Sequence, residues 1–489
     1  MSEDLADRVR EAAAWRISGD YSRAAAAYEA ILSRWPALPD CWYNLGWVQR
    51  RLGRPHEALR SYEQALAHGV AGPEEVRLNR AVIYVDDLHR YAEGEAELRA
   101  ALAHAPDYAP ALLNLANLCE DLGRRADALA LYERLLAAHP THWEGLSRYA
   151  SLNAAATADT DLVARLRHGL ERPDVSVADK ASLGFALGKV LDAAGAYREA
   201  FAAYRAANAA SRASAPPGVR GYDRAAQAAM TDALMATFPR PGAPLARSTR
   251  PAPIFICGMF RSGSTLLEQV LAGHSRVTAG GEIAALPQLV STALAPFPQA
   301  MAQVDDRRLA GVREAYLDMT TRIFPGADIL TDKRPDNFLS IGLIKAMFPD
   351  ARIINTVRNP RDNCLSIYFL HLDHAMAYAT DLADIAHYYS EYRRLMAHWR
   401  LHHGADIFDF DYDAFVRDPR PAVERVLAFC GLDWEEACLD FHRRRGAVKT
   451  ASVWQVRRPL YADASGRWRH YAADLGVLDA ALAPFIDKD

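Results

Sequence analysis

The segment 258–265, GMFRSGST, combines two glycines, several hydroxyl residues and one cation at a spacing that suits anion binding. It follows the apolar run PIFIC and precedes LLEQVL, which predicts a buried strand, a turn and then a helix. Such a turn directs backbone N–H groups and the positive end of a helix dipole to one point. Loops that bind nucleoside triphosphates read G-x-x-x-x-G-K-[ST], but here Ser264 stands at the lysine position and Arg261 supplies the cation. The loop therefore predicts an anion other than a triphosphate with magnesium.

The displaced arginine and the core RSGST resemble the 5′-phosphosulfate loop of the sulfotransferases, which use 3′-phosphoadenosine 5′-phosphosulfate (PAPS). The resemblance implies that this loop holds the phosphosulfate through Arg261, Ser262, Gly263, Ser264 and Thr265. It also implies that no metal is needed, because a sulfuryl group carries less charge than a γ-phosphoryl group and a forked guanidinium with N–H groups suffices. The alternatives are a structural strand-to-helix turn and a P-loop kinase. The missing lysine and the lack of an evident magnesium ligand argue against the kinase.

A second basic element lies in TVRNPRDNCLSIYF. Arg358 follows an apolar run, and Ser366 comes eight residues later inside a predicted helix. The resemblance extends to this interval, which in the same family marks the site of the 3′-phosphate, where a guanidinium pairs bidentately and a hydroxyl adds a bond. Arg361 either assists or forms a surface ion pair. The two motifs together are far more specific than either one alone.

Two further charged residues enter through the same resemblance. Glu282 lies twenty-one residues after Arg261, and tyrosylprotein sulfotransferases have a glutamate base at this interval. Glu282 is thus implied as the general base, with an exposed helix-capping acid as the alternative. Lys333, in LTDKRPDNF, resembles the lysine that neutralises charge on the leaving phosphate oxygen, with an ordinary ion pair to Asp332 as the alternative and Arg334 as a weaker candidate. The implied catalytic set is Glu282, Lys333 and Arg261.

The C-terminal part offers further nucleotide contacts by resemblance. DFDYDAFVRDP resembles a sulfotransferase element in which Tyr412 contacts the nucleotide. TASVWQVRRPLYADASGRWRHY resembles the terminal nucleotide-binding loop, and its arginines and aromatic residues suit an adenine flanked by phosphates. The candidates there are Ser452, Gln455, Arg457, Tyr461 and Arg467. Gly281 and Ala284 depart from the acidic residue and the arginine of the tyrosylprotein enzymes, so peptidyl tyrosine is not implied as the acceptor.

The elements that must position these residues alternate between strand and helix. Apolar runs at 253–257, 328–332, 351–357 and 406–412 predict strands, and amphipathic segments predict helices near residues 264, 339, 362, 384 and 414. This alternation predicts an α/β domain with a mostly parallel sheet, whose ligands bind beyond the carboxyl ends of the strands.

The N-terminal half carries an internal repeat. Gly19 and Gly53 lie 34 residues apart, each followed at equal distances by an alanine and then by Tyr28 or Tyr62. The pattern returns around Gly123 and resembles the tetratricopeptide repeat, of which five to six copies fit. Stacked helical hairpins of this kind form a concave face for a peptide, a partner protein or a second copy of the chain. The alternative is an array that only supports the neighbouring domain.

We therefore expect three parts, with residues 1–212 as an all-α superhelix of tetratricopeptide-like repeats and residues 213–253 as a helix and Pro-rich linker. The third part, residues 254–489, is the P-loop-like sulfotransferase domain. The whole resembles the bacterial tetratricopeptide-repeat sulfotransferase family, with a catalytic half similar to the tyrosylprotein sulfotransferases. The implied function is sulfuryl transfer from PAPS to an acceptor hydroxyl on a protein, a glycan or a small molecule. The alternative is an inactive repeat-based scaffold with a vestigial nucleotide site.

Composition narrows the setting. A net charge of −4 argues against binding to nucleic acid or to an anionic membrane. Six scattered cysteines without a C-x-x-C pair, no secretory signal and no apolar run of about 20 residues predict a cytoplasmic protein without a membrane span. His371, His374 and His387 lack a matched set of carboxylates, so no metal site is expected.

Overall fold

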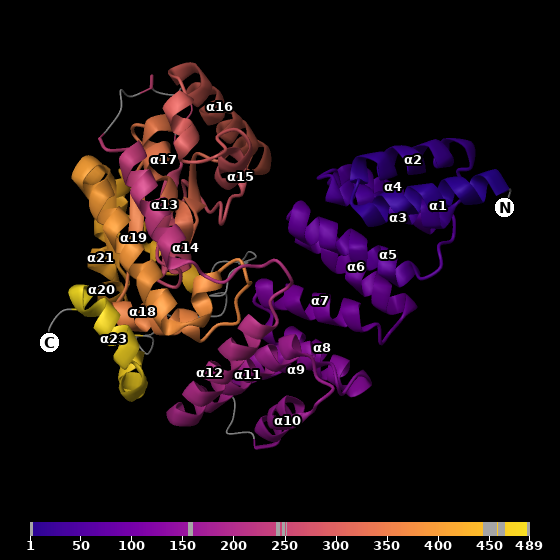
Figure 1. The fold of residues 1–489 in the computed structure, drawn as a ribbon, viewed down its shortest axis with the longest axis horizontal. Helices are drawn as coiled ribbons and strands as arrows, with labels where there is room; N and C mark the ends of the chain where they lie inside the picture. The colour runs from indigo at the N-terminus through magenta and orange to yellow at the C-terminus, as the bar shows by residue number, and fades with distance from the viewer. Residues whose placement is uncertain are drawn as a thin grey trace. The chain divides into compact units, whose positions relative to one another are not determined.

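The computed structural model describes residues 3–154, 160–240, 245–246, 250, 252–443, 457 and 465–486. The chain divides into two compact units, Met1–Asn153 and Ala154–Asp489. Figure 1 shows the first unit as helices only and the second as helices around a sheet.

In the first unit, successive helices contact one another as hairpins. The helices are α1 (Glu3–Ser18), α2 (Tyr21–Arg34), α3 (Pro39–Arg51), α4 (Pro55–Ala67), α5 (Pro73–Val82), α6 (Tyr91–His104), α7 (Ala109–Asp121), α8 (Arg125–Ala138) and α9 (Trp143–Asn153), and a short π-helix (Ile83–Asp87) extends α5. Gly19, Gly53 and Gly123 adopt positive φ between helices, which a residue with a side chain rarely does.

The repeated residue pattern marks the contacts inside these hairpins. Tyr28, Tyr62 and Tyr132 occupy equivalent places and are buried. Gly46 on α3 packs so closely on Tyr62 that an added Cβ atom would lie 3.0 Å from its ring. Small residues therefore let the paired helices approach while the tyrosines fill the space between them. The predicted all-helical repeat array is confirmed.

The second unit begins with four helices, α10 (Thr160–Glu171), α11 (Val177–Ala193), α12 (Tyr197–Ala213) and α13 (Arg224–Thr237). The α11–α12 hairpin has the repeat pattern, yet it packs within the second unit. Tyr204 stacks on Phe369 with 4.0 Å between ring centroids, and Asn208 donates to the carbonyl oxygen of Tyr368 over 2.9 Å. The repeat pattern in the sequence and the compact units thus have different boundaries. The pattern continues to about residue 212, whereas the units divide between Asn153 and Ala154.

The sheet has five parallel strands in the order β2-β3-β1-β4-β5. They are β1 (Ile254–Gly258), β2 (Val277–Thr278), β3 (Ile329–Lys333), β4 (Ile353–Val357) and β5 (Ile407–Asp411). The central strand β1 pairs Ile256 with Lys333 of β3 and Gly258 with Thr356 of β4. The predicted α/β fold with a parallel sheet is confirmed, and only the two-residue strand β2 was not predicted.

Helices cover both faces of the sheet. The α-helices that follow β1 among the described residues are α14 (Ser264–Leu271), α15 (Ala285–Thr292), α16 (Asp306–Ile323), α17 (Ile341–Met347), α18 (Pro360–Tyr368), α19 (Leu382–His403), α20 (Tyr412–Arg417), α21 (Pro419–Cys430) and α23 (Gly476–Leu482). Alternate residues of β1 face opposite layers. Ile256 packs with Leu267 and Val270 of α14, while Phe255 contacts the rings of Tyr316 on α16 and Phe348. Burial on both faces explains why β1 is a continuous apolar run.

Candidate active site

The loop between β1 and α14 is shaped by three residues with positive φ. Gly258 has φ 143°, and a Cβ atom there would lie 2.5 Å from Thr356 Oγ1. Gly263 has φ 106°, and its Cβ atom would lie 2.7 Å from the ring of Tyr412. Arg261 has φ 69°, a conformation that residues other than glycine rarely adopt and that often marks functional sites. The two glycines are therefore required by close packing, and the arginine is held in a strained turn.

Ser262 connects this loop to β4. Its side chain is buried, and its Oγ lies 2.6 Å from Thr356 Oγ1. Because Thr356 donates its hydroxyl proton to the carbonyl oxygen of Cys257, Ser262 is the donor between the two hydroxyls. The backbone N–H of Ser262 donates to the carbonyl oxygen of Met259. Both donors of Ser262 thus have partners within the protein, one in the loop and one on β4, and its contact with the phosphosulfate stays a prediction.

The two arginine motifs meet beyond the carboxyl ends of β1 and β4. Arg261 Nε donates to Ser366 Oγ over 3.1 Å, and Arg358 Nη1 donates to the carbonyl oxygen of Arg261 over 3.2 Å. Asn363 on α18 adds a bond of 2.6 Å to the carbonyl oxygen of Phe260. Segments about a hundred residues apart in the sequence therefore form one cationic site.

Tyr412 and the start of α14 complete this site. The Arg358 guanidinium lies 5.0 Å from the centroid of the Tyr412 ring, which also packs on Gly263. Ser264 and Thr265 form the first turn of α14, where the backbone N–H groups have no partner within the helix. Among the described residues, no side chain caps this helix. Its N–H groups and dipole are thus suited to an anion.

Glu282 and Lys333 form an ion pair at the neighbouring strand end. Lys333 Nζ lies 2.8 Å from Glu282 Oε1, and the lysine side chain is 1% exposed while the glutamate side chain is 41% exposed. The other acid considered as a partner, Asp332, faces away and accepts from Tyr316 Oη over 2.7 Å. Arg334 pairs with Asp336. The ammonium is therefore buried, and its partner carboxylate reaches solvent.

A third acid, Glu268 on α14, was missed by the sequence reasoning. It is 3% exposed, and its Oε1 accepts from Thr331 Oγ1 over 2.7 Å and from the Gly281 N–H over 2.9 Å. Burial raises the pKa of Glu268, and the charge of Lys333 opposes that rise. The available signal was an acid inside the apolar run TLLEQVL, on a helix that must pack on a sheet.

The C-terminal candidates are distributed differently. Ser452, Gln455 and Tyr461 lie outside the described residues, and Arg457 is described only as part of a turn. Arg467 pairs with Asp192 of α11 over 2.5 Å. That contact ties Arg467 to α11, and its contact with a nucleotide stays a prediction.

The segment around Gly466 is nevertheless anchored beside Arg358. Asp362, at the start of α18, accepts from the N–H groups of Gly466 over 2.6 Å and Trp468 over 2.8 Å. Arg361 forms an ion pair with Asp479 over 2.7 Å. Of the two roles considered for Arg361, the ion pair is the one observed.

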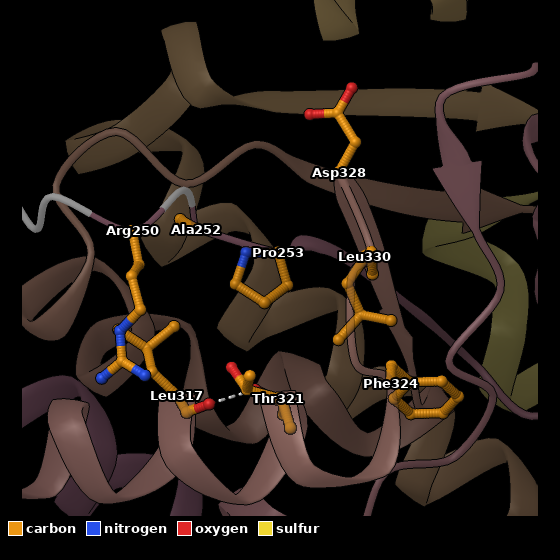
Figure 2. A pocket seen from close by; sticks show the side chains of 10 residues that line it. Arg250, Ala252, Pro253, Leu317, Thr321, Phe324, Asp328 and Leu330 are labelled. Atoms are coloured by element: carbon orange, nitrogen blue, oxygen red, sulfur yellow. Dashed lines mark hydrogen bonds between the residues drawn. The ribbon is translucent and has the colours of Figure 1, made fainter.

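A cavity at the opposite, amino-terminal end of the sheet offers no comparable chemistry. Its volume is about 160 Å³, and Figure 2 shows Arg250 and Thr321 on its wall. The Arg250 guanidinium is neutralised by Glu314 and Asp318. Among the described residues, no group of three His, Cys, Asp or Glu residues could hold a metal ion. No helix in the same part of the chain is long and apolar enough to cross a membrane.

Comparison with known proteins gives this site its class. Residues 253–436 match the model described as "Sulfotransferase family". Residues 17–75, 43–87 and 87–155 match models described as "Tetratricopeptide repeat". The second unit therefore contains a sulfotransferase domain. The chain as a whole joins this domain to preceding tetratricopeptide repeats, as the sequence resemblance predicted.

Two individual proteins are similar to this chain in sequence. A protein of Aquifex aeolicus (strain VF5) that carries the name "Uncharacterized protein" is 30% identical over 392 residues, 76% of this chain and 50% of that protein. This chain thus spans half the length of that relative. "Protein-tyrosine sulfotransferase 2" of Gallus gallus is 23% identical over 255 residues, 48% of this chain and 68% of that protein.

A solved structure, the "Sulfotransferase Domain from the Synechococcus PCC 7002 Olefin Synthase", aligns with 46% of this chain and 91% of its own at 21% identity. The TM-score of this alignment is 0.35.

Proposed function

We propose that this protein is an active sulfotransferase that moves a sulfuryl group from PAPS to an acceptor hydroxyl, with Glu282 as the general base. The observation that carries the proposal is the juxtaposition at three adjacent strand ends. β3 ends at Lys333, β1 leads into the loop of Arg261, and β4 leads to Arg358. Ligands of parallel sheets bind at this edge.

The residues at these strand ends fit a nucleotide with an anion at each end. Arg261 and the N-terminus of α14 would hold the 5′-phosphosulfate. Arg358 and Ser366, with Tyr412 beside them, would hold the 3′-phosphate side of the nucleotide. Ser262 would act mainly by fixing the loop to Thr356. When bound, PAPS supplies the activated sulfuryl group.

Glu282 and Lys333 would divide the remaining work. Glu282 is the more exposed partner of the pair and takes the proton from the acceptor hydroxyl. To do so, its carboxylate must turn from the ammonium toward the acceptor. Lys333 keeps its proton and neutralises charge on the leaving oxygen. The ion pair thus holds Glu282 and Lys333 side by side, and Glu282, the proposed base, is the member that reaches solvent.

The repeats would present an acceptor or a partner to the catalytic unit, which is the general use of such arrays. The acceptor is a hydroxyl on a protein, a glycan or a small molecule, and self-association is a further use of the array. A cytoplasmic location belongs to the same proposal. It is supported by the six cysteines, which are all free thiols and mostly buried.

The test is sulfuryl transfer from radiolabelled PAPS to panels of peptides, glycans and small alcohols, run beside binding of the product nucleotide 3′-phosphoadenosine 5′-phosphate (PAP). We expect transfer to at least one class and a PAP dissociation constant of roughly micromolar order. An inactive scaffold would bind PAP without any transfer. Binding of ATP only in the presence of magnesium would instead support a kinase and overturn the proposal.

A further inference from the structure

Glu268 is a buried acid that the proposed reaction leaves without a role. It lies on the face of α14 that packs on β3, and its Oε1 receives two donors, the Thr331 hydroxyl and the Gly281 N–H. Both donors fit an ionised carboxylate, which only accepts hydrogen bonds. Since a buried charge is costly, its retention next to the site calls for a counter-charge.

The bonds of Glu268 lead directly to the base. Gly280 N–H donates to Thr331 Oγ1 over 3.1 Å, and the Thr331 hydroxyl in turn donates to Glu268 Oε1 over 2.7 Å. The carbonyl oxygen of Gly281 accepts from the backbone N–H of Lys333 over 2.9 Å. A Cβ atom at Gly280 would lie 2.2 Å from the Thr331 carbonyl oxygen, so only glycine permits this approach. The turn that carries Glu282 is therefore held through the N–H groups of Gly280 and Gly281 and through the carbonyl oxygen of Gly281.

Lys333 interacts electrostatically with two acids. Its ammonium contacts Glu282, and its charge also stabilises ionised Glu268, whereas the two carboxylates repel each other. When Glu282 accepts a proton during the reaction, the buried ammonium loses its contact partner. Glu268 then remains as the nearby negative charge, so the buried ammonium is not left uncompensated.

We propose that Glu268 is a positioning residue for sulfuryl transfer: it holds the turn that carries Glu282 and balances the Lys333 charge when Glu282 takes the acceptor proton. The proposal rests on the proposed function. The proton moves from the acceptor hydroxyl to Glu282, while Lys333 keeps its own and Glu268 exchanges none. The sulfur–oxygen bond to the acceptor forms as the bond to the 5′-phosphate oxygen breaks.

The test compares Glu268→Gln, which keeps the shape and one acceptor oxygen, with Glu268→Ala, which removes both. Gln269→Ala on the same helix is the matched control, because its side chain is only partly buried. For Glu268→Gln we expect kcat to fall by about tenfold or more while PAP affinity stays within about twofold. The acidic limb of the pH–kcat profile should move to lower pH, because a carboxylate that repels the base is gone.

Two further readouts separate this role from simple packing. Hydrogen–deuterium exchange of residues 279–283 should speed up in Glu268→Ala and stay near the wild-type rate in Glu268→Gln, with no need for substrate. The other buried acid whose charge acts near this site is Asp332, whose pKa burial raises to about 6. The pH–kcat profile of Asp332→Asn should therefore be recorded as well, because any part of the wild-type pH dependence that is lost in this variant is due to Asp332.

Wild-type kcat and an unshifted profile in Glu268→Gln would overturn the proposal. So would a parallel loss of PAP affinity and kcat in both variants, which indicates a packing role. A wild-type protein that neither binds PAP nor transfers sulfate would instead overturn the proposed function, and this inference with it. The three outcomes are distinguishable from one another.

Discussion

Replacing Lys333 by methionine tests the charge arrangement most fully. The variant leaves two carboxylates without their cation, and they differ in burial. Glu282 is 41% exposed, so water compensates most of its lost pairing and that part costs little. Glu268 is buried, and without the ammonium its pKa rises further above the ordinary value. We expect a stability loss of about 1–3 kcal/mol near neutral pH, below the cost of breaking a fully buried pair.

The loss depends on pH with a defined sign. A carboxyl group whose pKa is raised in the folded state binds more protons folded than unfolded, so stability falls as pH rises through that window. Glu268 has this kind of shift, and the variant enlarges it. The difference in melting temperature between wild type and Lys333→Met should therefore be small near pH 5 and larger near pH 8. Each kcal/mol of lost stability should lower the melting temperature by about 2–4 °C.

The effect on catalysis should be larger than the effect on stability. Loss of a group that neutralises transition-state charge costs roughly a hundredfold to a thousandfold in kcat. Lys345→Met is the matched control, since the Lys345 side chain is also buried, pairs with Asp406 over 3.0 Å and lies on α17. The Lys345→Met variant should be less stable than wild type and have the wild-type kcat. A folded Lys333→Met protein with kcat within about threefold of wild type would refute the reasoning.

Three further predictions follow from single contacts. Arg358→Ala should raise the KM for PAPS by roughly tenfold to a hundredfold with a smaller change in kcat, because its guanidinium is assigned to binding, as measured by steady-state kinetics. Gly258→Ala should lower stability by roughly 2 kcal/mol or more in chemical denaturation, because the new Cβ atom would lie 2.5 Å from Thr356 Oγ1 and 2.6 Å from its carbonyl oxygen. Asp332 has a pKa raised by burial from 3.8 to about 6, so wild-type stability should fall as pH rises across that interval, and Asp332→Asn should flatten this part of the stability–pH curve.

Much of this fold was accessible from local sequence patterns. The strands β1, β3, β4 and β5 are predictable because each contains apolar residues in a short run that a helical segment follows. The strand β2 has only two residues and carries too little pattern. The α11–α12 hairpin shows the limit of a repeat pattern. Its residues look like another repeat, but Tyr204 and Asn208 pack on residues 368 and 369 within the second unit.

The candidate site was predictable where motifs are continuous and unpredictable where contacts are long-range. The motifs of Arg261 and Arg358 indicated a shared ligand, and the Arg261–Ser366 contact is consistent with that expectation. Glu268 escaped notice because its partners Thr331 and Gly281 are distant in sequence and bind it through a hydroxyl and a backbone N–H. The segment of Arg467 resembles a nucleotide-binding loop, but nothing local in the sequence indicates its ion-pair partner Asp192, which lies 275 residues earlier.

The central claim is that cations at neighbouring strand ends bind the two ends of one nucleotide. Calorimetric titration with PAP and with AMP, which lacks the 3′-phosphate, tests it most directly in wild type and in Arg358→Ala. We predict that wild type prefers PAP by roughly thirtyfold, about 2 kcal/mol, and that Arg358→Ala removes most of this preference. Equal affinity of wild type for PAP and AMP would contradict the account.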